Sequence, residues 1–256
     1  MTQAATLGRQ TMLENKIAVV TGANRGIGLA IAKTFAAQGA RVLACMRQVS
    51  DEALAEIAVD MGPGQVQVVA LDLADEVSIK AAIREIAQLT GNRVDVLVNN
   101  AGTASGGLFQ MTSIAEMRRV FDVNLFGQIL LTQGLSRLMV RRRAGSIINI
   151  ASTAADIADP GTLAYGASKA ALVRATGSMA TELGAYCVRV NAISPGVTRT
   201  DMFDQMAQEA RERLINSAAL KRAAEPADIA NVALFLASEL SGFVTGQVLC
   251  VDGGMV

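Results

Sequence analysis

Two hydrophobic patterns alternate along this chain. Short, continuous apolar runs rich in β-branched residues alternate with longer, Ala-rich amphipathic runs. A continuous apolar run is typical of a strand buried on both faces of a parallel sheet, and an amphipathic run is typical of a helix that covers such a sheet. The predicted strands are residues 17–20, 42–45, 66–70, 94–98, 146–150, 188–193 and 248–251. The predicted helices are residues 28–37, 51–60, 77–89, 115–140, 164–183, 205–216 and 227–237.

Repeated strand–helix units predict an α/β protein. We expect one Rossmann-type domain over residues 14–256, a doubly wound parallel sheet of about seven strands with helices on both faces, because no Pro/Ser-rich linker divides the chain. Residues 1–13 are expected to form a flexible N-terminal extension. Two residues mark helix ends: Gly39 fits the position just after the first helix, and Pro226 fits the first turn of the last one.

Composition removes several classes of function. Of the 256 residues, 51% are hydrophobic and 18% are charged, which excludes a disordered chain. Lys and Arg total 23 and Asp and Glu total 23, so the chain has no net charge to attract nucleic acid or an anionic membrane. The polar first residues do not resemble a signal peptide, and no apolar stretch approaches the ~18 residues of a membrane span. We therefore expect a cytoplasmic protein.

The absence of histidine restricts the chemistry further. It excludes Ser-His-Asp and Cys-His catalysis and any His-ligated zinc site, so a general acid or base must be Tyr, Lys, Asp, Glu or Cys. The three cysteines, Cys45, Cys187 and Cys250, are far apart and lie in apolar runs. We interpret them as buried free thiols in a reducing compartment and predict neither a disulfide nor a metal site.

A glycine-rich loop joins the first strand to the first helix. Its sequence is Thr21-Gly22-Ala23-Asn24-Arg25-Gly26-Ile27-Gly28. Glycines allow a tight turn and a close approach to a pyrophosphate, and the following helix offers free N–H groups to it. The spacing is Gly-x-x-x-Gly-x-Gly rather than Gly-x-Gly-x-x-Gly, and glycines also serve ordinary turns. The position between first strand and first helix nevertheless favours dinucleotide binding.

The end of the second strand predicts which dinucleotide binds. An NAD-binding protein places an acid there to hold the ribose 2′-hydroxyl, but this strand ends in Met46-Arg47 and the next acid is Asp51. Arg47, helped by Arg25, is suited to hold a 2′-phosphate through charge-assisted hydrogen bonds, which favours NADP(H). The alternative is that both arginines are ordinary solvated surface residues.

A tyrosine and a lysine one helical turn apart suggest acid–base chemistry. Tyr165 and Lys169 share a helix face, and a nearby ammonium is expected to lower the pKa of the tyrosine. Ser152, the segment Asn99-Asn100-Ala101-Gly102 and the pair Asp72-Leu73 each follow a predicted strand, where ligands bind in open α/β sheets. Taken singly, each could equally be a turn residue or a helix cap. Asn124 interrupts a long apolar helix run and predicts an internal break with a polar role.

Together these segments resemble the short-chain dehydrogenase/reductase family. The matching pieces, over about residues 14–256, are Thr21-Gly22-x-x-x-Gly26-x-Gly28, Asp72, Asn99-Asn100-Ala101-Gly102, Asn124, Ser152, Tyr165-x-x-x-Lys169 and Pro195-Gly196. The resemblance implies that Tyr165 is the general acid/base, while Lys169 tunes it and binds the nicotinamide ribose. It further implies that Ser152 orients the substrate carbonyl and that Asn124 holds a water in a proton relay.

The resemblance also implies the set of residues that bind the coenzyme. Asp72 would contact the adenine, Asn99, Ala101 and Gly102 would line the adenosine side, and Pro195 to Thr198 would position the carboxamide. The whole expected set is Gly22, Asn24, Arg25, Gly26, Ile27, Gly28, Arg47, Asp72, Leu73, Asn99, Ala101, Gly102, Tyr165, Lys169, Pro195, Gly196, Val197 and Thr198.

Within that family the chain is similar to bacterial 3-oxoacyl-acyl-carrier-protein reductases. The similar segments include Arg141-Arg142-Arg143, Thr200-Asp201-Met202 and Val244-Thr245-Gly246. Of the two basic positions with which those enzymes dock the acidic carrier protein, Arg143 matches and Tyr186 does not. This departure favours an NADPH-dependent carbonyl reductase acting on a free ketone, a secondary alcohol or a CoA ester. The alternatives are a carrier-protein-dependent reductase and a non-catalytic NADP-binding regulator.

Substrate pocket and assembly are less defined by the sequence. We expect residues 199–220 to form a mobile lid, and the resemblance implies a homotetramer built through the helices at 115–140 and 164–183 and through the last helix and strand. A methionine pair four residues apart, such as Met202 and Met206, more often packs in a core than lines a ligand site. The expected pocket residues are Gly102, Thr103, Ala154, Ala155, Asp159, Val197, Met202 and Met206.

Overall fold

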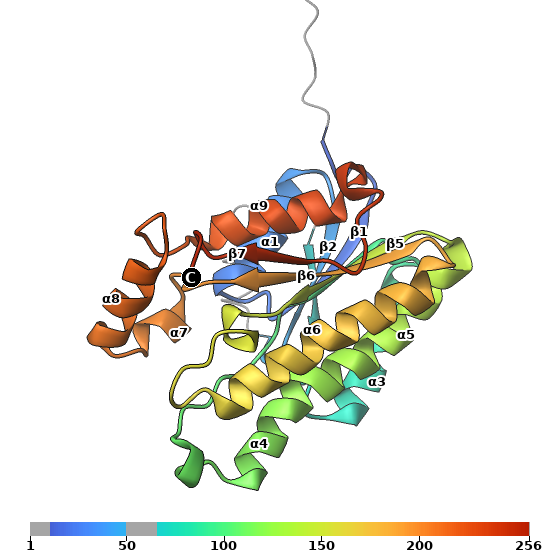
Figure 1. The fold of residues 1–256 in the computed structure, drawn as a ribbon. Coiled ribbons are helices and arrows are strands. Elements are labelled where there is room, and N and C mark those ends of the chain that lie inside the picture. Colours follow the sequence, from blue (N-terminus) through green and yellow to red (C-terminus); the bar gives the residue numbers. More distant parts are fainter. Residues whose placement is uncertain (1–10, 50–65, 256) are drawn as a thin grey trace, which may run out of the picture.

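The computed structural model describes residues 11–49 and 66–255 and contains one seven-stranded sheet (Figure 1). All paired strands are parallel, in the order β3-β2-β1-β4-β5-β6-β7. The strands are β1 (Ile17–Thr21), β2 (Arg41–Met46), β3 (Val66–Ala70), β4 (Val96–Asn99), β5 (Gly145–Ile150), β6 (Val188–Pro195) and β7 (Val248–Val251). The predicted α/β fold class and parallel sheet are therefore confirmed. The helix predicted at residues 51–60 lies outside the described residues.

Helices cover both faces of the sheet (Figure 1). The helices α1 (Gly26–Ala37) and α9 (Pro226–Ala237) pack together over one face, and α3 (Glu76–Leu89), α5 (Gly127–Arg142) and α6 (Leu163–Gly184) cover the other. The remaining helices are α4 (Ile114–Phe121), α7 (Asp201–Asp204), α8 (Gln208–Ser217) and short 3-10 turns at Phe109–Met111, Thr153–Ala155 and Glu239–Ser241. None of the described helices has the length and apolar character needed to cross a membrane.

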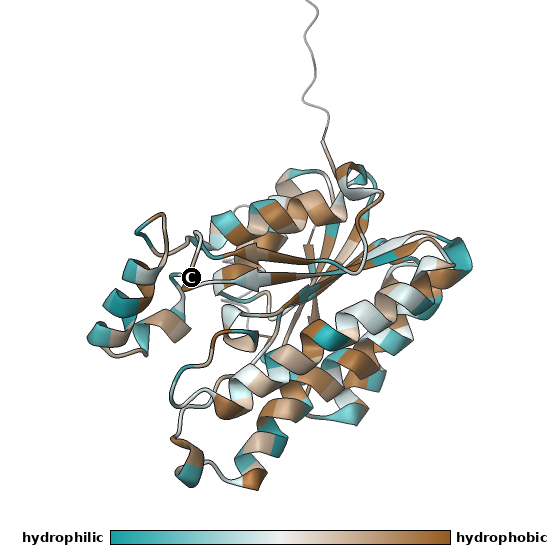
Figure 2. Cartoon of the chain, viewed as in Figure 1, coloured by the Kyte–Doolittle hydropathy of each residue, from teal (hydrophilic) through white to brown (hydrophobic). Residues whose placement is uncertain are grey.

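The sheet separates two hydrophobic cores, one under each layer of helices. Figure 2 shows the central strands hydrophobic along most of their length, whereas α8 is largely hydrophilic. Continuous apolar strands follow from this arrangement, because alternate side chains of one strand enter opposite cores. The strand order changes direction between β1 and β4, so the carboxyl ends of these strands open a crevice at the switch point.

Local capping explains where two helices start and stop. Gly39 follows α1 with a φ of +88°, a left-handed conformation that favours glycine. Pro226 is the first residue of α9, and the Asp228 carboxylate accepts a hydrogen bond from the Glu225 backbone N–H at 2.8 Å, closing a capping box. Both predicted helix ends are confirmed.

Two predicted helices differ from the structure, one by an internal break and one by its starting residue. The run at residues 115–140 consists of α4, a π-helical turn at Asp122–Phe126 and α5. Asn124 lies within the π turn, and its side chain bonds to the backbone of another segment, which accounts for the break that the sequence indicated. The run predicted at residues 205–216 corresponds to α8, which begins at Gln208, and the short helix α7 at Asp201–Asp204 precedes it.

Three residues behave differently from expectation. Leu13, which the sequence analysis placed in the extension, is fully buried, and its backbone N–H donates to the Gln38 carbonyl at 2.9 Å. The folded domain therefore begins before residue 14. Cys45 is a buried free thiol as expected, but Cys187 and Cys250 are free and exposed. Cys187 lies in the turn just before the buried strand β6, and Cys250 lies on the exposed edge strand β7, so hydrophobic neighbours alone did not predict burial.

A ladder of buried polar side chains crosses the sheet below the crevice. Asn99 on β4 donates through Nδ2 to the Thr132 hydroxyl at 2.9 Å and to Asn149 Oδ1 at 2.8 Å. Asn149, its register partner on β5, donates in turn to the Thr176 hydroxyl at 2.8 Å. The ladder links α5, β4, β5 and α6 through groups that are all nearly inaccessible to solvent. Each member depends on the others, because an unpaired buried amide is strongly unfavourable.

We predict that Asn99→Ala lowers the free energy of unfolding by about 2–4 kcal/mol, since it removes two buried hydrogen bonds and leaves a cavity. Urea unfolding followed by circular dichroism measures the loss. Gln133→Ala, at an exposed position of α5, is the control and should change stability by less than about 0.5 kcal/mol. Equal stability of the two variants would contradict a structural role for the ladder.

Candidate active site

The glycine-rich loop is shaped to approach a phosphate closely. Gly22 and Gly26 have φ values of +64° and +55°, and a Cβ atom on Gly28 would lie 2.2 Å from the Gly22 carbonyl oxygen. No side chain caps the N-terminus of α1. Its first N–H groups are therefore open to an anion, as a dinucleotide pyrophosphate requires. This cradle fits a nicotinamide dinucleotide.

Thr21 ties the glycine-rich loop to the segment that follows β4. Its hydroxyl oxygen accepts hydrogen bonds from the Asn100 and Ala101 backbone N–H groups, each at 2.9 Å. The Asn100 side chain donates back to the Thr21 and Gly22 carbonyls at 2.8 and 3.2 Å. Gln128, buried at the start of α5, donates to the Ala101 carbonyl at 2.7 Å.

These five hydrogen bonds give structural roles to three residues for which the sequence predicted none. Thr21 and Asn100 were part of recognised motifs without a role, and Gln128 was not singled out. The signal for Gln128 in the sequence was a glutamine next to Gly127 within an apolar run, because such a side chain needs an internal partner if it is buried.

The expected adenosine-binding residues divide into two groups. Asn99 and Leu73 direct their side chains into the core, so only their backbone can face the crevice. Asp72 and Arg47 follow the neighbouring strands β3 and β2, and Arg47 is exposed. The Asp72 carboxylate accepts a hydrogen bond from the Ala74 N–H at 2.9 Å, a turn contact that leaves its second oxygen available.

The segment after β6 forms the wall beside β5. Pro195 ends β6, and Gly196 is packed so tightly that a Cβ atom would lie 2.8 Å from the Asp252 Cα. Thr198 is buried and donates its hydroxyl to the Gly196 carbonyl at 3.0 Å. The Val197 carbonyl accepts a hydrogen bond from the Ala224 N–H at 2.9 Å, so the backbone of this wall is fixed on its outer side.

Four predicted catalytic residues come together beside this wall. The Ser152 and Tyr165 side chains share a hydrogen bond, and the Lys169 ammonium lies 5.8 Å from the centre of the Tyr165 ring. Lys169 donates to the Ile150 carbonyl at the end of β5 at 2.7 Å. A Cβ atom on Gly102 would lie 3.6 Å from the Lys169 Nζ and 3.3 Å from Asn124 Oδ1, which places Gly102 between them.

Asn124 organises the loop opposite the tyrosine. Its Oδ1 accepts from the Thr103 N–H at 2.8 Å, and its Nδ2 donates to the Thr103 carbonyl at 2.9 Å. Nδ2 also donates to the Ser168 hydroxyl at 3.0 Å, and Ser168 donates to the Tyr165 carbonyl at 2.7 Å. Asn124 thus connects the loop after β4 to the helix that carries Tyr165 and Lys169.

Burial controls the protonation of the two titratable residues. It raises the pKa of Tyr165 above its ordinary value, and the hydrogen bond from Ser152 partly offsets this effect. Burial also lowers the pKa of Lys169 from 10.5 to about 8. The expected lowering of the tyrosine pKa by Lys169 is therefore wrong for this structure, because the ammonium bonds to a backbone carbonyl rather than to the phenol.

The segment 199–220 bridges the two sides of the crevice. On one side, the Arg25 guanidinium in the glycine-rich loop pairs with Asp201 at the start of α7. On the other, Arg213 of α8 pairs with Asp159 at 3.0 Å, in the loop between Ser152 and Tyr165. Phe203 anchors α7 in the fold, whereas α8 has no buried residue. The predicted pocket residues Met202 and Met206 belong to this segment, and Met202 is exposed.

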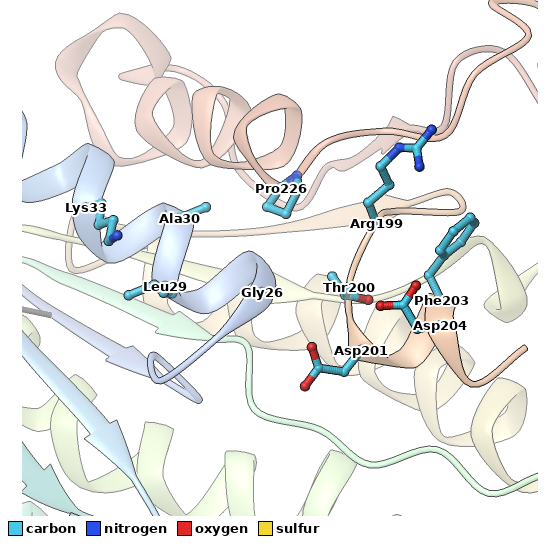
Figure 3. A pocket seen from close by; sticks show the side chains of 10 residues that line it. All are labelled: Gly26, Leu29, Ala30, Lys33, Arg199, Thr200, Asp201, Phe203, Asp204 and Pro226. Carbon is cyan, nitrogen blue, oxygen red and sulfur yellow. The ribbon is translucent and has the colours of Figure 1, made fainter. Parts of the chain in front are cut away.

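A cavity of about 590 Å³ lies between α1 and α7 (Figure 3). It is lined by Gly26, Leu29, Ala30, Lys33, Arg199, Thr200, Asp201, Phe203, Asp204 and Pro226. Ser152, Tyr165 and Lys169 are not among these residues, so the cavity is separate from the catalytic group.

Known proteins share this sequence and fold over nearly the whole chain. The family model described as enoyl-(acyl carrier protein) reductase matches residues 22–256. A 3-oxoacyl-acyl-carrier-protein reductase of Thermotoga maritima is 38% identical over 246 residues, which are 95% of this chain and 99% of that protein. A 3alpha-hydroxysteroid dehydrogenase of Mediterraneibacter gnavus is 36% identical over 244 residues, covering 94% of this chain and 97% of that protein. A solved structure from Beutenbergia cavernae, with NADP bound at low occupancy, has a TM-score of 0.87 and 36% identity, and covers 95% of this chain and 98% of that one.

The fold, the crevice and these similarities together define an oxidoreductase class. The chain belongs to the short-chain dehydrogenase/reductase family, and similar proteins include reductases of acyl-carrier-protein substrates. Proteins of this family bind a nicotinamide coenzyme, which the cradle at Gly22, Gly26 and Gly28 fits.

We predict that Lys169→Met stabilises the protein at pH 7 by about 1–3 kcal/mol. In the folded state Lys169 has a pKa of about 8, against 10.5 for an ordinary lysine, so the cost of burying its charge opposes folding below pH 8. The hydrogen bond of the ammonium offsets about 1 kcal/mol of that cost. Wild type should regain this stability as the pH rises from about 8 to 10.5, and the gap between the proteins should close.

Urea unfolding at pH 7 and pH 10 measures this gap. Lys80→Met, on the exposed face of α3, is the matched control and should shift stability by less than about 0.5 kcal/mol at either pH. A Lys169→Met protein less stable than wild type at pH 7 would show that the buried ammonium does not oppose folding.

Proposed function

We propose that this protein is an NADPH-dependent carbonyl reductase with Tyr165 as its general acid. The observation that carries the proposal is the grouping of a partly buried tyrosine, a serine hydrogen-bonded to it and a buried lysine beside the glycine-rich loop. When bound, the nicotinamide supplies the hydride for the carbonyl carbon. The residues of the chain then have to position the carbonyl and deliver one proton to its oxygen.

The Tyr165 hydroxyl donates that proton, and the Ser152 hydroxyl orients the carbonyl and stabilises the charge that develops on its oxygen. Because burial raises the pKa of Tyr165, the phenol is protonated at neutral pH, which is the form needed for reduction. Lys169, with a pKa of about 8, is mostly charged at pH 7 and supplies a cation near the site as negative charge forms. These protonation states favour reduction over alcohol oxidation.

Asn124 is proposed to hold the proton pathway in place. Asn124 binds both backbone groups of Thr103 and the Ser168 hydroxyl. Because Gly102 has no side chain, a narrow gap remains there between the Asn124 side chain and Lys169. A water in that gap would connect Lys169 to solvent. Such a relay would return a proton to Tyr165 after each turnover.

The preference for NADPH rests on the residues at the end of β2. Arg47 is exposed where an NAD-dependent protein would place an acid, and the related Beutenbergia cavernae structure carries NADP. Asp72 on the adjacent strand is proposed to contact the adenine. The remaining proposed coenzyme contacts are the backbone of residues 22–28, the backbone of 99–102 and the segment 195–198.

A second candidate is reduction of a 3-oxoacyl group on a carrier protein, which the similarity to such reductases favours. Against it, the Arg143 guanidinium donates to the Ala185 carbonyl at 2.9 Å, where it caps the end of α6, and Tyr186 is not basic. We therefore favour a free ketone or a CoA ester. NADPH oxidation with ketones, a 3-oxoacyl-CoA and a 3-oxoacyl carrier protein distinguishes these substrates, and turnover of any of them excludes a non-catalytic regulator.

The proposal includes a homotetramer working in the cytoplasm. Phe243 is fully exposed and Val248 lies at the solvent-exposed outer edge of the sheet, which supports contact with another subunit through the last helix and strand. The exposed free thiols of Cys187 and Cys250 suit a reducing compartment.

We predict that Tyr165→Phe lowers the turnover rate by about 10²–10⁴-fold, since the ring can still pack but no proton can be donated. Steady-state NADPH oxidation with the best ketone of the panel measures the rate. NADPH affinity, measured by titrating coenzyme fluorescence, should be nearly unchanged. A Tyr165→Phe rate within about threefold of wild type, compared with that range, would remove Tyr165 from the mechanism.

We predict that Arg47→Ala weakens NADPH binding by about 10–150-fold, the loss of one charge-assisted hydrogen bond. NADH lacks the 2′-phosphate, so its affinity should stay the same. Parallel titrations of both coenzymes at low and high salt test this selectivity. Equal losses for the two coenzymes would mean that Arg47 supports the fold and does not recognise phosphate.

A further inference from the structure

The arginine of the glycine-rich loop already has an anionic partner. Arg25 donates through Nη1 to Asp201 Oδ2, and the two residues are 176 positions apart in the sequence. Both side chains are more than half exposed. Their ion pair therefore connects the loop before α1 to the first turn of α7 at the rim of the crevice.

The fold brings Asp201 to this place through its neighbour Thr200. A Cβ atom on Gly26 would lie 3.2 Å from the Thr200 Cγ2, so the chain that leaves β6 passes directly against the glycine-rich loop. Beside this contact, the cavity separates α7 from α1, and Asp201 extends toward the α1 side (Figure 3). The cavity therefore borders the ion pair on the Asp201 side, and the Arg25 side chain, which is 66% exposed, is not held by packing.

We propose that Asp201 competes with the 2′-phosphate of NADP(H) for Arg25 and thereby sets the affinity for the phosphorylated coenzyme. This inference rests on the proposed use of NADP(H). A 2′-phosphate carries more charge than a carboxylate and has three acceptor oxygens, so it is the stronger partner for a guanidinium. The 2′-phosphate and the Asp201 carboxylate repel one another, so Arg25 binds only one of them strongly at a time.

The exchange links the coenzyme to the lid. Once Arg25 turns to the 2′-phosphate, α7 loses its ion pair with the glycine-rich loop, while the Arg213–Asp159 pair still holds α8 to the other wall. NADH has no 2′-phosphate and leaves the Arg25–Asp201 pair intact. The ion pair that holds α7 to the glycine-rich loop is thus lost when NADP(H) binds and kept when NADH binds.

The size of the effect follows from the exposure of the pair. An exposed ion pair favours its closed form only modestly, so a substantial fraction of molecules have Arg25 free. Because apparent affinity scales with that fraction, Asp201→Asn should tighten binding of 2′-phosphorylated ligands by about two- to sixfold. Binding of ligands that lack the 2′-phosphate should not change.

Calorimetric titration of the full chain with adenosine 2′,5′-bisphosphate, AMP, NADPH and NADH tests this inference. The expected result is tighter binding of the first and third ligands to Asp201→Asn and unchanged binding of the other two. Asp204→Asn is the matched control, since it removes the same charge from the same helix and no cation among the described residues pairs with Asp204. Its affinities should stay within about 1.5-fold of wild type.

A second background separates direct competition from long-range repulsion. In Arg25→Gln, Asp201→Asn should no longer change any affinity. Equal gains with and without Arg25, equal gains from Asp204→Asn, or weaker binding to Asp201→Asn would each overturn the competition. Wild type that binds adenosine 2′,5′-bisphosphate no better than AMP would instead refute the proposed NADP(H) preference, and the competition with it.

Discussion

The binding of Thr21 to the segment after β4 is the contact on which the rest of the site depends. Its buried hydroxyl accepts two backbone N–H groups at the point where the strand order reverses, and it donates to the Val98 carbonyl at 3.3 Å. The same contact fixes the glycine-rich loop on one side and the Ala101–Thr103 backbone on the other. Asn124 and Gln128 hold that backbone from below. The proposed coenzyme cradle and the proposed catalytic residues are thus parts of one hydrogen-bonded unit.

Burial shifts the pKa values of the titratable groups in this unit, and the burial of charge opposes its stability. Lys169 is almost inaccessible to solvent, and its hydrogen bond to a backbone carbonyl compensates for only part of the cost of burying its charge. Its pKa is therefore lowered to about 8, and the side chain is still mostly charged at neutral pH. The nearby tyrosine is kept protonated by the same low-dielectric surroundings. The ladder of amides and hydroxyls around Asn99 lies beneath, where hydrogen bonds from the Asn99 amide N–H groups link β4 to β5 and α5.

The segment α7–α8 is held by different interactions from those that hold the predicted site. Apart from Phe203, the segment α7–α8 buries little, and ion pairs hold it to the two walls of the crevice. Exposed ion pairs contribute little stability and exchange partners readily, which is compatible with the proposed role of this segment as a lid. Its position is therefore sensitive to charges that enter the crevice, whereas the packed sheet is not.

The sequence by itself determined the elements, the parallel sheet and the group of residues at its carboxyl edge. Continuous apolar strands, glycines with required backbone geometry and the Tyr165–Lys169 spacing are local properties, and local properties can be read along a chain. The tertiary structure alone decided that Asn99 points into the core, that Lys169 bonds to Ile150 instead of the phenol, and that Arg25 meets Asp201. Each of these depends on groups far apart in sequence, whose burial and distance exist only once the strands and helices have packed.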